Sequence, residues 1–156
     1  MRISSRRIAI DTGVWVESIL VNSEYYHLAR TIRTLVEKGR IIALITPLTT
    51  TEVYYVSYRV YRRLGLSNEE AIRRAERFFE LLYTSNNVEV IINSEVAKQA
   101  ATIKLEYNLA LSDCYLLAVS RILNVPALFR HVEREMEPIV SDLRREFNIY
   151  FLSDFS

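Results

Sequence analysis

Three acidic residues stand where the chain is expected to leave or approach a strand of a parallel sheet. Asp11 directly follows the apolar run 8–10, and Glu52 lies in the first turn of the helix expected after the run 41–45. Asp113 opens a helix late in the chain. In an open α/β sheet, ligands bind just beyond the carboxyl ends of the strands. The three carboxylates are therefore expected to meet at one edge of the sheet.

Each of these acids also has a purely structural interpretation. Asp11 could cap the helix that follows it, because Asp is a favoured N-cap residue. Residues 49–52 match a capping box, in which Glu52 would only accept from a backbone N–H. Asp113 lies at a helix start, where the helix dipole favours an acid. Both interpretations stay open for each residue, although two of the four aspartates in the chain take these positions.

If the three acids meet, their mutual repulsion must be offset. Two like charges ~4 Å apart cost about 4 kcal/mol at an effective dielectric constant near 20. A hard divalent cation is the usual solution, and proteins typically hold Mg²⁺ with one or two carboxylates plus water. Zinc is not indicated, since His27 and His131 are isolated and Cys114 has no partner cysteine. The pattern favours a magnesium site.

The elements that would position the acids alternate along the chain. Buried strands are predicted at residues 8–10, 41–45, 88–92, 125–129 and 149–152, where short apolar runs end in turn signals. Helices are expected between them, with starts at Ser23, Ser67, Ser94 and Ser112 and a short apolar helix at 14–20. This alternation predicts the α/β class with a largely parallel sheet. The helices on either side of Gly65 are expected to form a projecting αα-hairpin.

Length and composition are those of one globular domain spanning residues 1–156. The chain is 50% hydrophobic and 25% charged, which is ordinary for a folded protein. No apolar run approaches the roughly 20 residues that span a bilayer, so no membrane contact is expected. The single cysteine excludes an internal disulfide framework and fits a reducing, cytoplasmic location. Glycine-rich phosphate loops and nucleophile elbows are absent from the sequence.

Three motifs together resemble the PIN-domain ribonucleases and, within them, the VapC-type toxins of toxin–antitoxin pairs. The motifs are residues 8–12 (IAIDT), 49–53 (TTTEV) and 111–118 (LSDCYLLA). Each motif is short, but their order and spacing fit over essentially the whole chain. The resemblance implies a PIN-like three-layer α/β/α fold with a central sheet of about five strands. It also implies that Asp11, Glu52 and Asp113 form an acidic Mg²⁺ or Mn²⁺ site for cleaving RNA phosphodiester bonds.

The chain departs from this family at the fourth acid. Many relatives have Thr-x-Asp soon after the fourth strand, where this chain has residues 129–131 (FRH). Glu133 follows two residues later and is the best candidate for the fourth catalytic acid, with Glu135 as the alternative. Both could instead be solvated helix charges. The departure leaves the second metal position open.

Contacts with RNA are expected from Thr12, Arg130 and Arg134, which lie close to the predicted acids. The hairpin 52–83 carries more apolar side chains than one small sheet could easily cover. These are Tyr54, Tyr55, Tyr58, Tyr61, Leu64, Phe78, Phe79 and Leu82. An exposed apolar patch of more than a few hundred Å² usually marks an interface. We therefore expect a homodimer that pairs through these helices and leaves a groove for an antitoxin.

The predicted function is a metal-dependent endoribonuclease that acts as the toxin of a VapBC-type pair and is silenced by a small antitoxin protein. A housekeeping nuclease is the other role for the same activity. The main alternative is a PIN-like domain that binds RNA or protein without cutting, which the loss of the fourth acid would favour. A magnesium-dependent phosphatase is a weaker alternative, since Thr12 and Gly13 follow Asp11 where such enzymes need Asp-x-Asp.

Overall fold

The computed structural model describes residues 6–155, which form a five-stranded sheet in the order β3-β2-β1-β4-β5. The strands are β1 (Arg7–Ile10), β2 (Ile42–Ile45), β3 (Val88–Val90), β4 (Ala127–Phe129) and β5 (Ile149–Phe151). All four neighbouring pairs run parallel. The α/β class and the parallel sheet of five strands are therefore confirmed.

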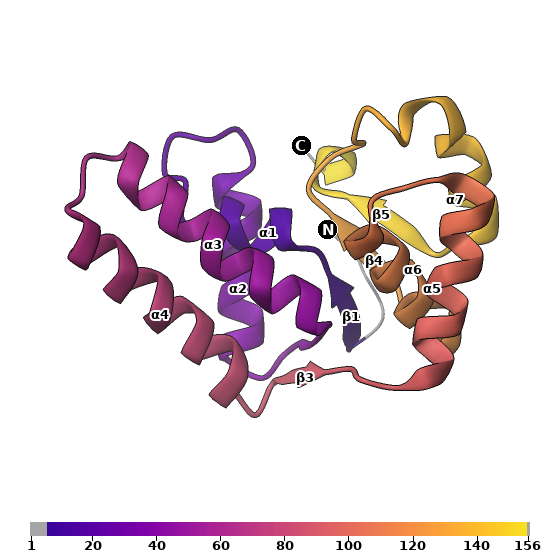
Figure 1. The fold of residues 1–156 in the computed structure, drawn as a ribbon, viewed down its shortest axis with the longest axis horizontal. Helices are drawn as coiled ribbons and strands as arrows, with labels where there is room; N and C mark the ends of the chain where they lie inside the picture. Colours follow the sequence, from indigo (N-terminus) through magenta and orange to yellow (C-terminus); the bar gives the residue numbers. More distant parts are fainter. Residues whose placement is uncertain (1–5, 156) are drawn as a thin grey trace.

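Helices cover both faces of the sheet (Figure 1). One apolar cluster joins Ala9 and Leu44 to the helices α5 (Ser94–Tyr107), α6 (Leu111–Leu123) and α7 (Val140–Glu146). The strand neighbours Ile8 and Ile10 lie in the other cluster. That cluster includes residues of α1 (Thr12–Glu17), α2 (Tyr26–Glu37), α3 (Pro47–Arg63) and α4 (Asn68–Thr84). Because successive strand residues point to opposite faces, β1, β2 and β4 are buried on both sides, and the sheet with its two helical layers makes three layers. The edge strand β3 is only partly buried, contrary to the prediction of a buried strand there.

Short 3₁₀ turns complete the C-terminal part, at Glu137–Ile139 and Leu152–Phe155. No helix among residues 6–155 is both long enough and apolar enough to cross a membrane.

The predicted αα-hairpin is present as α3 and α4, which lie side by side away from α5–α7 (Figure 1). Gly65 has φ +87° in the turn between them, a conformation that favours glycine. The expected exposure of its apolar side chains is only partly correct. Phe78 and Leu82 are 4% and 0% exposed and belong to the core beneath the hairpin, whereas Tyr55 and Leu64 are exposed.

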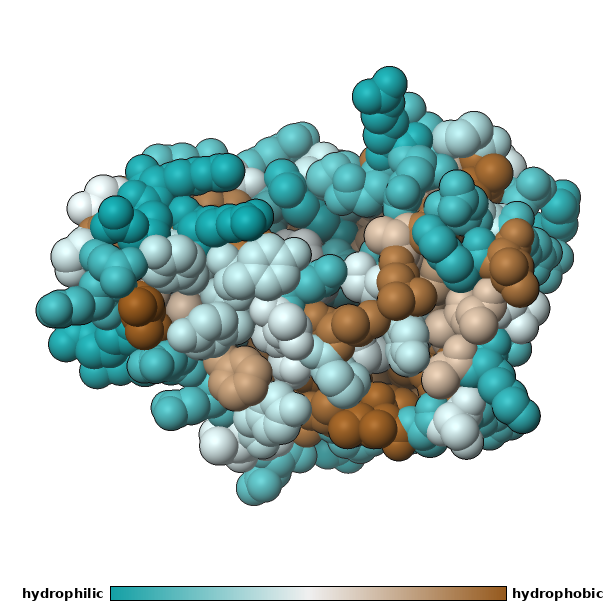
Figure 2. Space-filling view, in the orientation of Figure 1, coloured by the Kyte–Doolittle hydropathy of each residue, from teal (hydrophilic) through white to brown (hydrophobic). Residues whose placement is uncertain are grey.

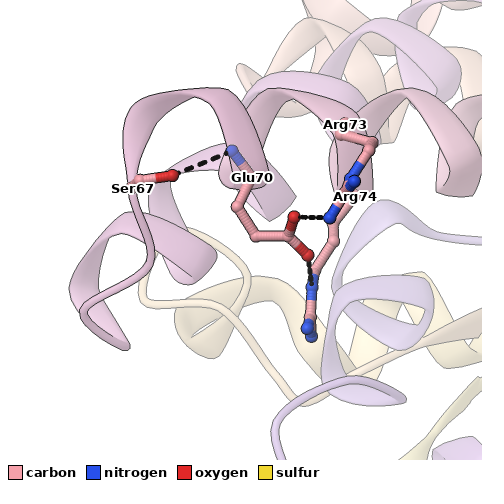
Figure 3. A network of polar contacts seen from close by, with 4 residues as sticks. All are labelled: Ser67, Glu70, Arg73 and Arg74. Atoms are coloured by element: carbon pink, nitrogen blue, oxygen red, sulfur yellow. Dashed lines mark hydrogen bonds and ion pairs between the residues drawn. The ribbon is translucent and has the colours of Figure 1, made fainter.

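The start of α4 follows the predicted cap in one half only. Ser67 Oγ accepts a hydrogen bond from the backbone N–H of Glu70 at 3.2 Å. The Glu70 carboxylate does not turn back to complete a capping box but pairs with Arg73 and with Arg74 Nε, the latter at 2.7 Å (Figure 3). These are exposed ion pairs within one helix.

Other helix starts differ from the sequence prediction. α2 begins at Tyr26 without a side-chain cap, so Ser23 is not its N-cap. α5 is capped by Asn93, which accepts from the N–H of Val96 at 2.7 Å and takes the role expected of Ser94. α1 starts at Thr12, two residues earlier than predicted, because Asp11 is its N-cap.

Candidate active site

The candidate site lies at the switch point of the sheet, between β1 and β4, where the chain passes from one side of β1 to the other. Chain order runs from β1 outward through β2 and β3, and then returns to the other side of β1 through β4 and β5. The crevice beyond the carboxyl ends of such neighbouring strands is the usual ligand position in open parallel sheets. Asp11 directly follows β1 and Arg130 directly follows β4. The topology therefore places an acid and a base side by side at this crevice.

Asp11 has both its structural role and a position in the site. Its carboxylate accepts a hydrogen bond from the N–H of Gly13 at 2.7 Å and caps α1. A side chain on residue 13 would come within 2.8 Å of the Asp11 carboxylate and 3.0 Å of Arg130 Cβ. Glycine at this position leaves room for the side chains of Asp11 and Arg130 to lie close together.

Glu52 is not the capping residue that the sequence suggested. α3 begins at Pro47, and its N-terminus is closed by Thr46 and Thr49, whose side chains each bond the other residue's backbone N–H. Glu52 therefore falls in the second turn of the helix. One of its carboxylate oxygens accepts from the Thr12 hydroxyl at 2.7 Å. Thr12 thus fixes Glu52 beside Asp11 from across the crevice.

Asp113 lies in the first turn of α6 and is only 8% exposed. No hydrogen bond or ion pair to its carboxyl group is found within residues 6–155. Its neighbour Cys114 is fully buried, and burial raises the pKa of that thiol to about 11. Cys114 is therefore a packing residue of the core and not a reactive thiol.

The two candidates for the fourth acid have different surroundings. Glu135 Oε1 accepts from the backbone N–H of Ala110 at 2.6 Å, across 25 residues of sequence. Ala110 is the N-cap residue of α6 and has no side-chain cap of its own. Glu133 makes no such contact, and His131 Nε2 lies 3.5 Å from its carboxylate. Glu135 is therefore engaged in holding α6, whereas Glu133 is the less constrained acid.

One cavity of about 750 Å³ collects all the site residues predicted from the sequence. They are Asp11, Thr12, Glu52, Asp113, Arg130, Glu133, Arg134 and Glu135. Its remaining walls include Gly13, Val16, Glu17, Tyr55, Val56, Ala110 and Ser112. The roles of these residues stay predictions, but their common position follows from the fold.

Burial and crowding of like charges act strongly on the two aspartates. The pKa of Asp11 is raised from 3.8 to about 7, and burial is the largest cause. The negative charges of Glu52 and Glu133 raise this pKa further, whereas the hydrogen bond from Gly13 lowers it. Burial likewise raises the pKa of Asp113 to about 8, and among the neighbouring charges Asp11 raises this pKa most. Perturbed acids that gather in a cleft are typical of functional sites.

The donor chemistry of this cavity fits a hard divalent cation. It presents carboxylate oxygens, and its buried Asp113 lacks a cationic side-chain partner among the described residues. Within residues 6–155, however, no three His, Cys, Asp or Glu side chains are close enough to bind one ion together. The acids line one cavity but do not form a complete set of metal ligands, so their side chains would have to move closer together to bind an ion.

Sequence reasoning missed Glu17, which is completely buried and contributes to the cavity wall. Its carboxylate lies 2.7 Å from Arg130 Nε and also accepts from the N–H of Tyr25 at 3.2 Å. The signal was present in the sequence, because Glu17 is an acid that ends the apolar run 14–16. Because burying an unpaired charge is costly, an acid on a buried helix face is expected to have a basic or hydrogen-bonding partner.

The chain belongs to the PIN domain family, whose model matches residues 7–121. That match includes Asp11, Glu52 and Asp113, while Glu133 and Glu135 lie beyond its end. No curated protein sequence matches the chain.

Two solved structures share the fold at low sequence identity. A toxin–antitoxin complex from Klebsiella pneumoniae has a TM-score of 0.58 at 15% identity, covering 95% of this chain and 98% of that chain. VapBC2 from Rickettsia felis, bound to a DNA fragment from its promoter, has a TM-score of 0.58 at 10% identity. That alignment covers 93% of this chain and 96% of the other. The predicted PIN-like fold is confirmed over nearly the whole chain.

Proposed function

We propose that the protein is a Mg²⁺- or Mn²⁺-dependent endoribonuclease. The observation that carries this proposal is the position of Asp11, Glu52 and Asp113 around one cavity at the switch point of a PIN fold. Arg130 and Arg134 are the basic side chains on the same cavity, and arginine is a common donor to phosphate oxygens. Acids for a metal and arginines for a phosphate are therefore combined in one site.

Asp11 and Asp113 would hold the cation, because they are the acids whose charged forms are least compensated by the protein. A divalent cation bound there would supply positive charge next to the phosphate and activate water. Glu52, oriented by the Thr12 hydroxyl, would accept the proton that the attacking water loses. Water adds to phosphorus, the bond to the departing ribose oxygen breaks, and that oxygen takes up a proton.

The alternative of a PIN-like domain that binds RNA or protein without cutting is favoured by one observation. No three acids among the described residues are close enough to share an ion. The two functions differ in metal binding, since a non-cleaving domain has no need for the cation.

We further propose that the protein is the toxin of a toxin–antitoxin pair. Among the solved structures that share its fold are a complex named as a toxin–antitoxin complex and VapBC2. A groove of about 530 Å³ along the hairpin, lined by Thr51, Tyr54, Tyr55, Glu76, Phe79 and Glu80, would take a segment of the antitoxin. Tyr55 lines both this groove and the acidic cavity. A segment bound here would reach the site and block access to it. The cytoplasm, where such pairs would meet RNA, is the proposed location.

The test combines calorimetry with an RNA cleavage assay on the wild type and on Asp113→Asn. We expect Mn²⁺ binding and Mn²⁺-dependent cleavage by the wild type, and loss of both in the variant while its melting temperature is maintained. Unchanged Mn²⁺ binding in Asp113→Asn would reject the metal site. Wild-type protein that binds RNA but neither binds Mn²⁺ nor cuts would establish the non-cleaving alternative.

A further inference from the structure

The Glu17–Arg130 contact joins a fully buried acid to a partly exposed base at the edge of the candidate site. Glu17 is 0% exposed, and each of its carboxylate oxygens has a neighbour, Tyr25 N–H for one and Arg130 Nε for the other. Arg130 Nε and Glu17 Oε2 are buried and 2.7 Å apart without the alignment of a hydrogen bond, so their contact is an ion pair.

Stability does not explain why a charged pair stands here. Replacing a buried ion pair with apolar residues of similar volume is often neutral or stabilising. Glu17 follows three buried apolar residues, Val14, Trp15 and Val16. A residue whose charge brings no clear gain in stability is a candidate for a functional role.

The pair uses only one edge of the guanidinium group. Glu17 occupies the Nε side, and neither terminal nitrogen of Arg130 donates to another residue within the described part of the chain. The side chain of Arg130 is 39% exposed. The terminal nitrogens of a fixed guanidinium form a planar fork that matches two oxygens of a phosphate.

Arg130 also stands between two hollows. It lines the acidic cavity and a second hollow of about 390 Å³, whose other walls are residues 19–23 and Leu64. An RNA strand with one phosphate beside the acids and its next nucleotide in the second hollow must pass Arg130. Arg134 lines only the acidic cavity and has no ion-pair partner within residues 6–155.

We propose that Glu17 is a positioning residue that holds Arg130 as a clamp for the RNA phosphate adjoining the scissile one. This inference rests on the proposed ribonuclease function and adds the route of the strand, from the acidic cavity past Arg130 into the hollow at residues 19–23. Arg130 contacts the substrate, and Glu17 acts only through Arg130.

The direction in which RNA affinity changes in Glu17→Gln distinguishes two roles for Glu17: positioning Arg130, or only neutralising its charge. Glu17→Gln removes a negative charge near RNA, so electrostatics alone predicts tighter RNA binding. Positioning predicts weaker binding, because the guanidinium is no longer fixed. We expect the dissociation constant for a labelled single-stranded RNA, measured in EDTA so that no cleavage occurs, to rise by about 10-fold in Glu17→Gln and in Arg130→Ala.

Three further readouts test the assignment. The dependence of log K on log salt concentration should become shallower by about 0.7 in Arg130→Ala, the value for one lost contact with single-stranded RNA. The double variant should bind no more weakly than Arg130→Ala, since Glu17 acts through Arg130. In cleavage assays with Mn²⁺, KM should rise more than kcat falls, and Mn²⁺ affinity should stay unchanged.

The matched control is the Glu70–Arg74 pair on the hairpin, whose carboxylate also lies 2.7 Å from an arginine Nε (Figure 3). Glu70→Gln and Arg74→Ala should bind RNA as the wild type does. If Glu17→Gln does not fold, Arg130→Ala and Arg130→Lys provide the test. Arg130→Lys should bind RNA with an affinity between those of the wild type and Arg130→Ala, because lysine keeps the positive charge but lacks the planar fork of the guanidinium.

Two outcomes overturn the inference, and they are distinguishable from failure of the ribonuclease proposal. RNA binding by Glu17→Gln that equals or exceeds that of the wild type rejects positioning, and wild-type binding by Arg130→Ala rejects the clamp. Wild-type protein that binds no RNA at all rejects both this inference and the proposed function.

Discussion

Asp113 is the residue at which folding and function conflict most directly. It is buried, unpaired among the described residues and surrounded by other acids, so its charged form is unfavourable in the folded protein. A purely structural residue at a helix start would meet no such penalty. The arrangement is reasonable if a cation compensates the charge, because a metal ligand must give up its proton to bind.

The raised pKa of Asp113 predicts how stability changes with pH in EDTA. The pKa of Asp113 is about 8 in the folded protein and near 3.8 in the unfolded chain, so the folded state binds the proton more tightly. The contribution of Asp113 to the free energy of unfolding is therefore complete below about pH 4 and is lost as the pH rises through 8. Between pH 5 and pH 8.5 the wild type should lose at least about 3 °C more in melting temperature than Asp113→Asn, equivalent to about 1 kcal/mol.

Melting curves followed by circular dichroism measure this difference, and added Mg²⁺ should reduce the loss in the wild type only. Equal losses in the two proteins would show that Asp113 does not titrate in this range.

Glu133 is the acid that we expect to complete the site. It lines the cavity, and His131 is its one ion-pair neighbour within residues 6–155. Glu133→Gln should lower the RNA cleavage rate by about 10-fold or more, because a charge near the reacting phosphate is lost while the side-chain volume is kept. Single-turnover cleavage with saturating Mn²⁺ measures the effect. A wild-type rate in this variant would leave a site of three acids.

At the scale of the elements, the start of each helix decides which side chains reach the cavity. Residues 49–52 look like a capping box in the sequence, which would have assigned Glu52 to the helix backbone. Pro47 instead takes the first position of α3, and Thr46 provides the cap. Because Pro fixes φ near the helical value and its missing N–H is not needed there, the helix begins earlier. Glu52 is thereby left for Thr12 and the site.

The start of α6 is held from outside the helix, which gives a prediction for Glu135. Its carboxylate accepts a hydrogen bond from the backbone N–H of Ala110, the N-cap residue of α6, which has no side-chain cap. Glu135→Ala should lower the melting temperature by about 2–4 °C, the effect of losing a hydrogen bond worth about 1 kcal/mol, and should weaken Mn²⁺ binding by shifting Asp113.

Glu135→Gln is the control for this effect, because its amide oxygen still accepts from the N–H of Ala110. This variant should melt and cleave RNA nearly as the wild type does. If Glu135→Gln instead loses as much activity as Glu133→Gln, Glu135 is a catalytic acid and does not serve only to hold the start of α6.

The elements were largely predictable because their signals are local. Five short apolar runs each became a strand, and Ser67 caps a helix where a helix start was expected. Contacts between distant residues were not predictable. Glu135 reaches Ala110 and Arg130 reaches Glu17 only because the sheet order places the loop after β4 beside α1 and α6. Asp11 and Asp113 could be selected as candidates because one follows a recognisable strand and the other lies at a recognisable helix start, and Glu52 because it lies in a recognisable motif.

At the scale of the whole molecule, two grooves of different character flank the acidic cavity. The hairpin groove carries two acids, Glu76 and Glu80, which suit a basic segment of a partner. A second groove of about 380 Å³ has no charged residue in its walls and includes Ile92 and Leu111, which are 75% and 51% exposed. Apolar surface is visible beside β3 in the space-filling view (Figure 2).

The difference in charge predicts which groove mediates the expected homodimer. In a twofold dimer the same patch faces itself, so acids in the hairpin groove would be brought close to one another, whereas the uncharged groove can pair with its copy. We therefore expect dimerisation through the groove that contains Ile92, and not through the hairpin as the sequence suggested. This assignment leaves the hairpin groove available to the antitoxin.

Light scattering at micromolar concentration should give a mass about twice 18.2 kDa for the wild type. Ile92→Glu should give the monomer, because it places a charge in the uncharged groove, while Tyr55→Glu on the hairpin should stay dimeric. Both side chains are well exposed, at 75% and 41%, so neither change disturbs the core. A wild-type mass of 18.2 kDa would reject the dimer. A monomeric Tyr55→Glu beside a dimeric Ile92→Glu would return the interface to the hairpin, where it would compete with the antitoxin for one surface.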